Sequence, residues 1–171
     1  MSATNPPNYF RPTPKPGIPT WLGAWWPAIL WAVIISIFST DAFSAEHTSL
    51  VIEPILRWIY PAISEDTLDL AHHLVRKSAH FIEYFVFFLL LYHGFRATRR
   101  DSRPWHWSWA LIAWLIAAVY SVLDEVHQIF VPSRGPSPWD SLLDSTGALF
   151  ALFALFLLYR RFLRTRPDES A

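Results

Sequence analysis

Four stretches of apolar residues, each close to the length of a membrane-crossing helix, constrain the fold of this chain more than any other feature. They cover about residues 21–39, 77–95, 107–127 and 139–159. A helix needs about 20 residues to cross roughly 30 Å of hydrocarbon. Only 16% of the residues are charged, whereas a soluble domain carries about 25%. The sequence therefore predicts an all-α, polytopic membrane protein with four transmembrane helices.

The distribution of Lys and Arg predicts the orientation of these helices. Ten of the fourteen basic residues lie before the first stretch, between the second and third, or after the fourth. Positive residues collect on the cytoplasmic side of membrane proteins, so both termini are expected in the cytoplasm. Residues 1–20 are Pro-rich and lack a signal-peptide pattern. We expect them to be a disordered cytoplasmic tail, followed by a membrane domain over 21–160 and a basic cytoplasmic tail over 161–171.

The outer segment between the first and second stretches, residues 41–76, has features of two helices. The first is amphipathic, is expected to start near Pro54, and is expected to lie in the membrane interface. Its apolar residues recur at helical spacing: Val51, Ile55, Trp58 and Ile59. Ser64 followed by Glu65 and Asp66 is typical of a helix start. That second helix should continue into the second apolar stretch and protrude beyond the outer surface.

Polar side chains lie in or beside the last three stretches, near one end of each. They are Lys77, His80, Glu83, Asp124, Glu125, His127, Gln128, Arg134, Asp140 and Asp144. Charged groups in membrane helices are costly and persist mainly when paired or facing a watery cavity. Because the helix directions alternate, all of these residues are expected at the outer surface. The pattern predicts a polar pocket that reaches partway into the bilayer from outside.

Helical spacing places most of these residues on shared faces. The faces comprise Lys77, His80 and Tyr84 on the second helix, Tyr120, Asp124, His127 and Gln128 on the third, and Asp140, Asp144 and Gly147 on the fourth. Gly147 and Ala151 form a pair of small residues that allows close helix approach. Arg134, in the Pro- and Gly-rich loop between the third and fourth helices, could clamp a carboxylate of the protein or a phosphate of a ligand.

These polar blocks carry a resemblance to a known family. Lys77-Ser-Ala-His80-Phe-Ile-Glu83-Tyr84, the block from Tyr120 through Asp124-Glu125-Val-His127-Gln128 to Arg134, and Asp140-Ser-Leu-Leu-Asp144-Ser-Thr-Gly147 resemble the VanZ-like family over about residues 27–159. The resemblance implies a small four-helix protein of the bacterial cytoplasmic membrane. Its namesake is associated with low-level resistance to the glycopeptide teicoplanin. The family name supplies no reaction, so enzymatic activity, cofactor and oligomeric state stay open.

Two functional hypotheses follow for the pocket. In the first, it binds the head group of a lipid-linked phosphate or wall precursor. The ligand-binding set would be Lys77, His80, Glu83, Gln128, Arg134, Asp140 and Asp144, and the residues available as a catalytic base would be Asp124, Glu125 and His127. In the second, a non-catalytic envelope factor uses the same surface to bind a partner and alter glycopeptide access. A paired network that merely fixes helix register is the structural alternative.

Other functional classes fit the sequence less well. Charge at one membrane face argues against a transporter, whose sites usually lie near the midplane. The nitrogen and oxygen ligands lack a spacing that would fix a metal site. The chain has no cysteine, which excludes thiol chemistry, and it has no basic groove suited to nucleic acid. The expected partners are therefore the lipid bilayer and a ligand within it.

Overall fold

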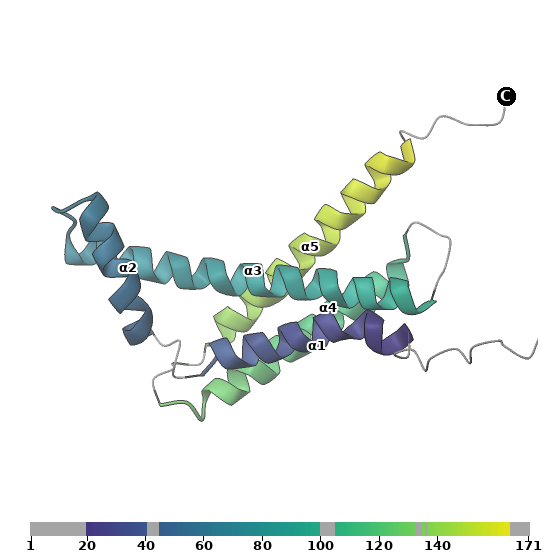
Figure 1. The fold of residues 1–171 in the computed structure, drawn as a ribbon, viewed down its shortest axis with the longest axis horizontal. Coiled ribbons are helices and arrows are strands. Elements are labelled where there is room, and N and C mark those ends of the chain that lie inside the picture. The colour runs from purple at the N-terminus through teal and green to yellow at the C-terminus, as the bar shows by residue number, and fades with distance from the viewer. Residues whose placement is uncertain (1–19, 41–44, 100–104, 133–134, 136, 165–171) are drawn as a thin grey trace, which may run out of the picture.

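The protein is all-α, as the sequence predicts. A computed structural model describes residues 20–40, 45–99, 105–132, 135 and 137–164. Within these ranges the chain forms five helices and no strand (Figure 1). The helices are α1 (Thr20–Phe38), α2 (Ala45–Ile59), α3 (Glu65–Arg99), α4 (Trp107–Gln128) and α5 (Pro138–Arg164). The predicted tail over 1–20 lies almost wholly outside the described residues, and α5 continues to Arg164, into the predicted C-terminal tail.

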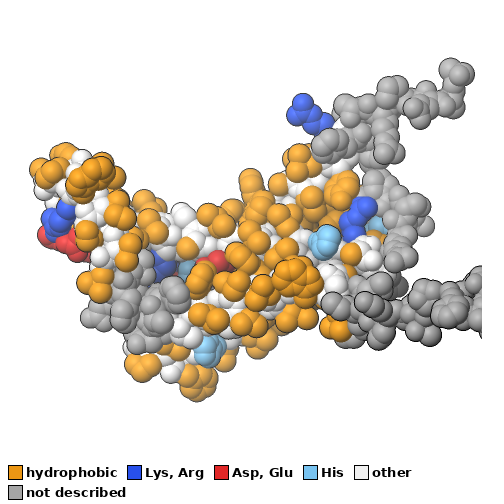
Figure 2. Space-filling view, viewed as in Figure 1, with side chains coloured by type: hydrophobic (Ala, Val, Ile, Leu, Met, Phe, Trp, Pro, Cys, Tyr) orange, Lys and Arg blue, Asp and Glu red, His pale blue; other side chains and the backbone are white. Residues whose placement is uncertain are grey.

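Two helices are long and apolar enough to cross a membrane, those over Trp107–Gln128 and Pro138–Arg161. Their most apolar windows are only 33% and 28% buried inside the protein, whereas the core helix of a soluble protein is mostly buried. Their outer faces expose apolar side chains such as Leu115, Val119 and Phe153, and hydrophobic side chains cover most of the visible surface (Figure 2). An apolar patch of this extent marks a surface that contacts something other than water.

The other two predicted spans lie in helices that do not meet the same criteria of length and apolarity. The apolar part of α1, Leu22–Phe38, is shorter than a full span. The stretch over 77–95 is the second half of α3, whose 35 residues carry charged groups along the first half. The first half extends α3 well past the ends of its neighbours (Figure 1). Four membrane crossings thus stay a prediction for the chain as a whole.

The start of α3 agrees with the cap expected at Ser64. The Ser64 hydroxyl accepts the backbone N–H of Thr67 at 3.4 Å, and its carbonyl accepts the N–H of Leu68 at 3.0 Å. Glu65 and Asp66 stand in the first turn, where negative charge is favourable. At a rise of 1.5 Å per residue, α3 is about 52 Å long, which exceeds the thickness of a bilayer core.

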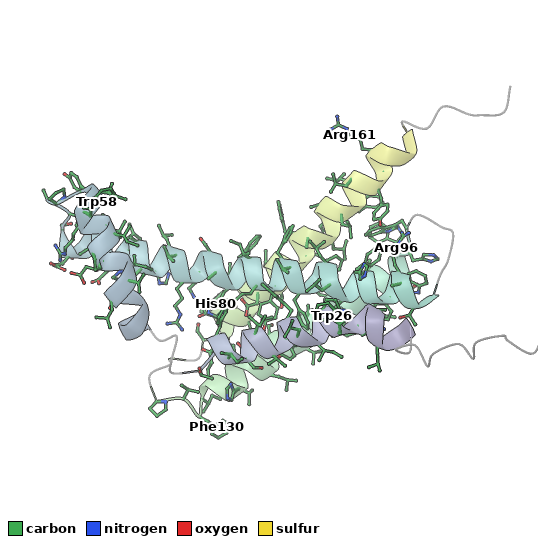
Figure 3. All side chains as sticks on the ribbon, in the orientation of Figure 1. Trp26, Trp58, His80, Arg96, Phe130 and Arg161 are labelled. Atoms are coloured by element: carbon green, nitrogen blue, oxygen red, sulfur yellow. The ribbon has the colours of Figure 1, made fainter. Side chains whose placement is uncertain are left out.

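The amphipathic helix α2 starts earlier than its sequence indicates. It begins at Ala45 and contains Pro54 within its length, so Pro54 is not its entry point. Arg57 donates to Glu53 at 2.8 Å and to Glu65 at 2.7 Å, which ties α2 to the first turn of α3. These hydrogen bonds, with Glu53 the stronger, raise the pKa of the exposed Arg57. Trp58 on this helix is 84% exposed and lies at the far end of the molecule (Figure 3).

Contacts between the helices show that α1, α3, α4 and α5 alternate in direction. Trp25 of α1 packs on Phe95, whereas Trp31, two turns later, donates to the earlier residue Glu83 at 2.9 Å, so α1 and α3 are antiparallel. Trp114 donates to the Ser145 carbonyl at 3.1 Å, and Ser121 lies 2.8 Å from Ser141, so α4 and α5 are antiparallel too.

The ends predicted to share the outer surface therefore meet at one end of the bundle. A second consequence is that α3 and α5 run parallel. Phe81 and Phe85 of α3 both contact Phe150 of α5.

The closest crossing in the bundle is that of α3 over α5 at Gly147. A Cβ atom at Gly147 would collide with the carbonyl oxygen of Phe81 and lie 3.1 Å from its carbonyl carbon. The obstacle is backbone, which does not move aside as a flexible side chain does. Gly147, predicted to allow close helix packing, does so within this chain.

Replacing Gly147 with alanine should destabilise the bundle. The methyl group has to push α3 away from α5, and overpacking of this kind costs about 1–3 kcal/mol. We expect a lower midpoint for thermal or detergent-induced unfolding of the purified protein. Gly23→Ala is the matched control, because a Cβ atom at Gly23 meets nothing within 4 Å. Equal midpoints for the two variants would show that the crossing is not tight.

Candidate functional site

A cluster of polar side chains is buried at the end of the bundle where α1 and α4 end and α5 begins. We call it the polar site. Its members come from four helices, and buried among them are Ser39, His80, Ser121, Asp124, Glu125, Gln128, Asp140 and Asp144. His80 lies inside this end of the bundle, whereas Arg96 and Arg161 lie at the opposite end (Figure 3). The sequence prediction that the polar blocks converge at one end is therefore matched by their placement.

Two basic residues of α3 pair with two acids of α5. Lys77 Nζ forms an ion pair with Asp140 Oδ1, and His80 Nδ1 lies 3.3 Å from Asp144 Oδ1. The steps of three residues on α3 and four on α5 match one turn of each helix. Asp144 is fully buried. A carboxylate in that environment needs a cation or a proton to offset its desolvation, and His80 is placed to supply either.

Asp124 is held by neutral donors. Its Oδ2 atom accepts from the Ser39 hydroxyl at 2.5 Å and from the Gln128 amide at 3.2 Å. Ser39 closes the last turn of α1, since its N–H bonds to the Ile35 carbonyl. Hydrogen bonds to an ionised oxygen are about twice as strong as neutral ones. The Asp124 side chain therefore fastens the end of α4 to the end of α1.

A second acid, Glu125, fastens α4 to the start of α5. Its Oε2 atom accepts the backbone N–H of Ser137 at 2.7 Å, just before α5 begins. One turn further in, the hydroxyls of Ser121 and Ser141 lie 2.8 Å apart. This contact continues the polar link between the two helices into the bundle.

Several buried atoms of the polar site lack a hydrogen-bond partner among the described residues. They are Tyr84 OH, His80 Nδ1, Glu125 Oε1, Gln128 Oε1, both carboxylate oxygens of Asp144 and the Nε atom of Arg76. His80 Nδ1 and Asp144 Oδ1 are close enough to pair by charge but do not form a hydrogen bond. Buried polar groups in proteins are nearly always paired, so such a concentration calls for an explanation. Buried donors and acceptors without a partner in the protein are what a polar ligand or bound water requires.

Arg76 is a member of the site that sequence reasoning did not include. It is half-buried, one residue before Lys77, and close enough to act electrostatically on both Lys77 and His80. Helical spacing places Arg76 on a different face of α3 from Lys77 and His80, which is why it was not predicted. The sequence feature that could have pointed to Arg76 is its position next to Lys77, where α3 leaves the bundle.

The serine residues were likewise outside the predicted site set. Ser141 and Ser145 follow one another at a spacing of four residues on α5, which is the signal of a polar stripe on an otherwise apolar helix. Ser39 is the last residue of the first apolar stretch, and no role is predicted for it from the sequence. The structure makes it the donor to Asp124.

Three predicted site residues are not part of the buried cluster as described. His127 is exposed, outside the buried face of α4, so it is not brought to Asp124 and Glu125. Glu83 is half-buried, one turn beyond His80, and acts on it electrostatically. Arg134 lies outside the described residues.

A side groove adjoins the polar site between α4 and α5. Its volume is about 590 Å³, and it combines apolar walls with polar groups at one edge. The walls are Val122, Val126, Ile129, Pro138 and Leu142, and the polar groups are Glu125, Ser137, Ser141 and Ser145. Glu125 and Ser137 belong to both the groove and the polar site. The groove therefore leads from an exposed, apolar surface to the buried polar groups.

Metal-ligand geometry does not arise in this cluster. Among the residues that the structure describes, no three His, Asp or Glu side chains are grouped so that they could hold a metal ion. Each acid is instead paired with a different group of the protein.

The fold and the site define a class: an all-helical protein with apolar outer faces and a buried polar site at one end of the bundle. A model of the family described as VanZ/LLP1 matches residues 24–160, which include the four helices of the bundle and every residue of the polar site. The chain therefore belongs to the VanZ/LLP1 family. Neither the curated proteins nor the solved structures compared with it gave a match.

The Ser39–Asp124 bond should stabilise the folded bundle measurably. Ser39→Ala leaves a buried carboxylate with one donor fewer, and we expect a loss of about 1–3 kcal/mol in the free energy of unfolding. In a double-mutant cycle with Asp124→Ala, which leaves no acceptor, the two substitutions should be non-additive by at least about 0.5 kcal/mol in detergent-induced unfolding. Ser78→Ala, at an exposed position of α3, serves as the control. Additive effects would mean that the bond contributes nothing.

Proposed function

We propose that the polar site binds the phosphate-bearing head group of a lipid or wall precursor in the outer leaflet of a bacterial cytoplasmic membrane. In this proposal α1, the second half of α3, α4 and α5 are the four membrane spans. Both termini are cytoplasmic, because the arginine-rich end of the bundle is opposite the polar site. The alternating helix directions and the exposed apolar faces support this topology.

The cationic pair Arg76 and Lys77 is the observation that carries the proposal. Lys77 is 27% exposed, while its partner Asp140 is 5% exposed. The carboxylate therefore anchors the ammonium group from inside. An ammonium group has three donors, and the ion pair with Asp140 uses one of them. Arg76 adds a guanidinium whose buried Nε has no partner among the described residues. Two adjacent cations with unused donors suit a phosphate, which accepts several charge-assisted hydrogen bonds.

The acids of the site do not oppose this role, because each lies against a basic side chain or a hydrogen-bond donor of the protein. Asp140 is matched by Lys77, Asp144 by His80, Asp124 by Ser39 and Gln128, and Glu125 by the N–H of Ser137. An anion approaching Arg76 and Lys77 therefore meets carboxylates that are already compensated. It also meets cations that these carboxylates hold in place.

The side groove supports a lipid as the carrier of the phosphate. Its apolar walls face the membrane side of α4 and α5, and Glu125 at its edge acts electrostatically on Lys77. A hydrocarbon chain in the groove would leave its polar end at the site. About 590 Å³ lies within the usual range for small-molecule sites.

A second candidate, an enzyme that hydrolyses the bound phosphate ester, is favoured by the pairing of His80 with Asp144. A histidine oriented by a buried carboxylate is a common general base. Release of inorganic phosphate from an isoprenyl phosphate, abolished by His80→Gln, would establish this activity. Binding without release would leave a recognition protein.

The membrane topology is open to a direct test because the chain has no cysteine. A single cysteine introduced at the exposed position Gly135, beside the polar site, should react in intact cells with a maleimide that does not cross membranes. A cysteine at the exposed position Arg161 should react only after the membrane is permeabilised. Labelling of both in intact cells would contradict the proposed crossing.

Lys77→Gln should weaken the binding of an isoprenyl phosphate by roughly 10- to 100-fold, the equivalent of a charged hydrogen bond of about 1.5–3 kcal/mol. Titration of the detergent-purified protein, followed by native mass spectrometry, measures the change. Arg161→Gln, at the other end of the bundle, is the matched control and should bind as the original protein does.

The corresponding isoprenyl alcohol separates the head group from the chain. It should bind weakly, and Lys77→Gln should leave that binding unchanged. Equal affinity for alcohol and phosphate would overturn the proposal that the polar site reads the phosphate.

In cells, head-group binding is proposed to underlie a contribution to teicoplanin tolerance. Lys77→Gln and Asp124→Ala, expressed at the normal level, should then lower the teicoplanin concentration that growth withstands, with Arg161→Gln as the control. Full tolerance in both variants would separate the site from the glycopeptide response.

A further inference from the structure

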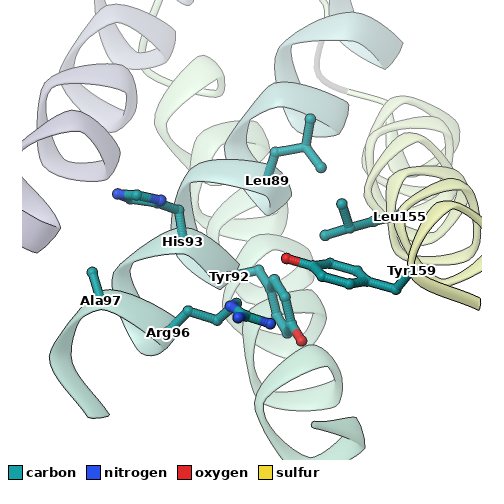
Figure 4. A pocket seen from close by; sticks show the side chains of 7 residues that line it. All are labelled: Leu89, Tyr92, His93, Arg96, Ala97, Leu155 and Tyr159. Carbon is teal, nitrogen blue, oxygen red and sulfur yellow. The ribbon is translucent and has the colours of Figure 1, made fainter. Parts of the chain in front are cut away.

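A second groove lies between α3 and α5 at the arginine-rich end, away from the polar site. We call it the inner groove. Its volume is about 500 Å³, and the side chains that line it are drawn in Figure 4. They are Leu89, Tyr92, His93, Arg96 and Ala97 from α3 and Leu155 and Tyr159 from α5. The groove therefore has one apolar end and one polar end.

Arg96 is the charged group of the inner groove and is held in a defined place. Its guanidinium carbon lies 5.1 Å from the centre of the Tyr159 ring, a cation–π arrangement that keeps the charge while orienting the plane. Tyr92 behind it accepts the backbone N–H of His106 at 3.3 Å. Figure 4 shows Arg96, Tyr92 and Tyr159 gathered on the same side of the groove. A guanidinium positioned in this way is prepared for a planar, multi-bond contact with phosphate.

The two ends of the groove are spaced as a phospholipid requires. Leu89 and Arg96 are seven residues apart on α3, which is about 10 Å along the helix axis. Leu89 and Leu155 form the apolar end, where acyl chains would enter. Arg96 and the exposed His93 form the end towards the last turn of α3, where the membrane surface would lie.

We propose that the inner groove binds an anionic glycerophospholipid of the inner leaflet, with Arg96 contacting its phosphate and Leu89 and Leu155 contacting its acyl chains. Basic pockets between membrane helices on the cytoplasmic side are suited to such head groups. The proposal rests on the membrane placement proposed above but not on the ligand of the polar site. Failure of outer head-group binding therefore leaves it standing, and the cysteine labelling tests the placement separately.

The experiment titrates the delipidated, detergent-purified protein with phosphatidylglycerol and with phosphatidylcholine of the same acyl chains, followed by native mass spectrometry. The original protein should bind phosphatidylglycerol at least about tenfold more tightly, and Arg96→Gln should remove that preference. Arg161→Gln removes the same charge from an exposed position of α5 that does not line the groove. It should keep the preference within about twofold. Equal losses in the two variants would overturn the proposal in favour of diffuse attraction.

Two further measurements complete the test. The first uses a second variant, in case Arg96→Gln does not fold, and the second tests whether the ligand is free phosphate and not a lipid. Leu155→Trp fills the apolar end without touching the charge, and it should also abolish binding of phosphatidylglycerol. Unchanged binding in Leu155→Trp would overturn the assignment of the acyl chains to this groove. Millimolar inorganic phosphate should not displace the lipid. Displacement would show that the groove is a site for free phosphate instead.

Discussion

The close approach of α3 and α5 at Gly147 is the contact on which the rest of the bundle depends. Because residue 147 has no side chain, the backbone of Phe81 can lie against it, and the two parallel helices stay in register on both sides of the contact. His80 and Lys77 lie just before Phe81, and Asp144 and Asp140 lie one and two turns before Gly147. The crossing therefore sets the distances at which both ion pairs form.

Pairing solves the energetic problem that burying these charges creates. A carboxylate moved from water into an apolar interior loses several kcal/mol of solvation unless a partner offsets it. The polar site offsets each of its four acids with a donor from a different helix or from the turn before α5. The acids can then fasten helix ends together while Arg76 and Lys77 retain donors that the described residues do not use. The structural role and the proposed ligand contacts thus belong to different members of one network.

Much of this arrangement could be predicted from the sequence, because hydrophobic length and helical spacing are local properties. They indicate the four apolar stretches, the start of α3 after Ser64, and the convergence of Lys77, His80, Asp124, Asp140 and Asp144 at one end. Local spacing fails where the rotation of a helix about its axis decides the outcome. His127 shares an approximate face with Asp124 in the sequence, yet α4 turns Glu125 and Gln128 inward and leaves His127 outside. The partial burial of Arg76 likewise depends on how α3 leaves the bundle, which local spacing does not predict.

The parallel pair α3 and α5 also explains how one chain can present two different polar regions. Residues of α3 face residues of α5 that are 63 to 69 positions later, from Lys77 and Asp140 at one end to Arg96 and Tyr159 at the other. Between these ends the interface is aromatic and aliphatic, with Phe81 and Phe85 against Phe150. Apolar packing in the middle separates the acids from the guanidinium by several helical turns, so each region keeps its own electrostatic character. The same two helices can therefore hold a compensated, acid-rich site at one end of the bundle and a cationic groove at the other.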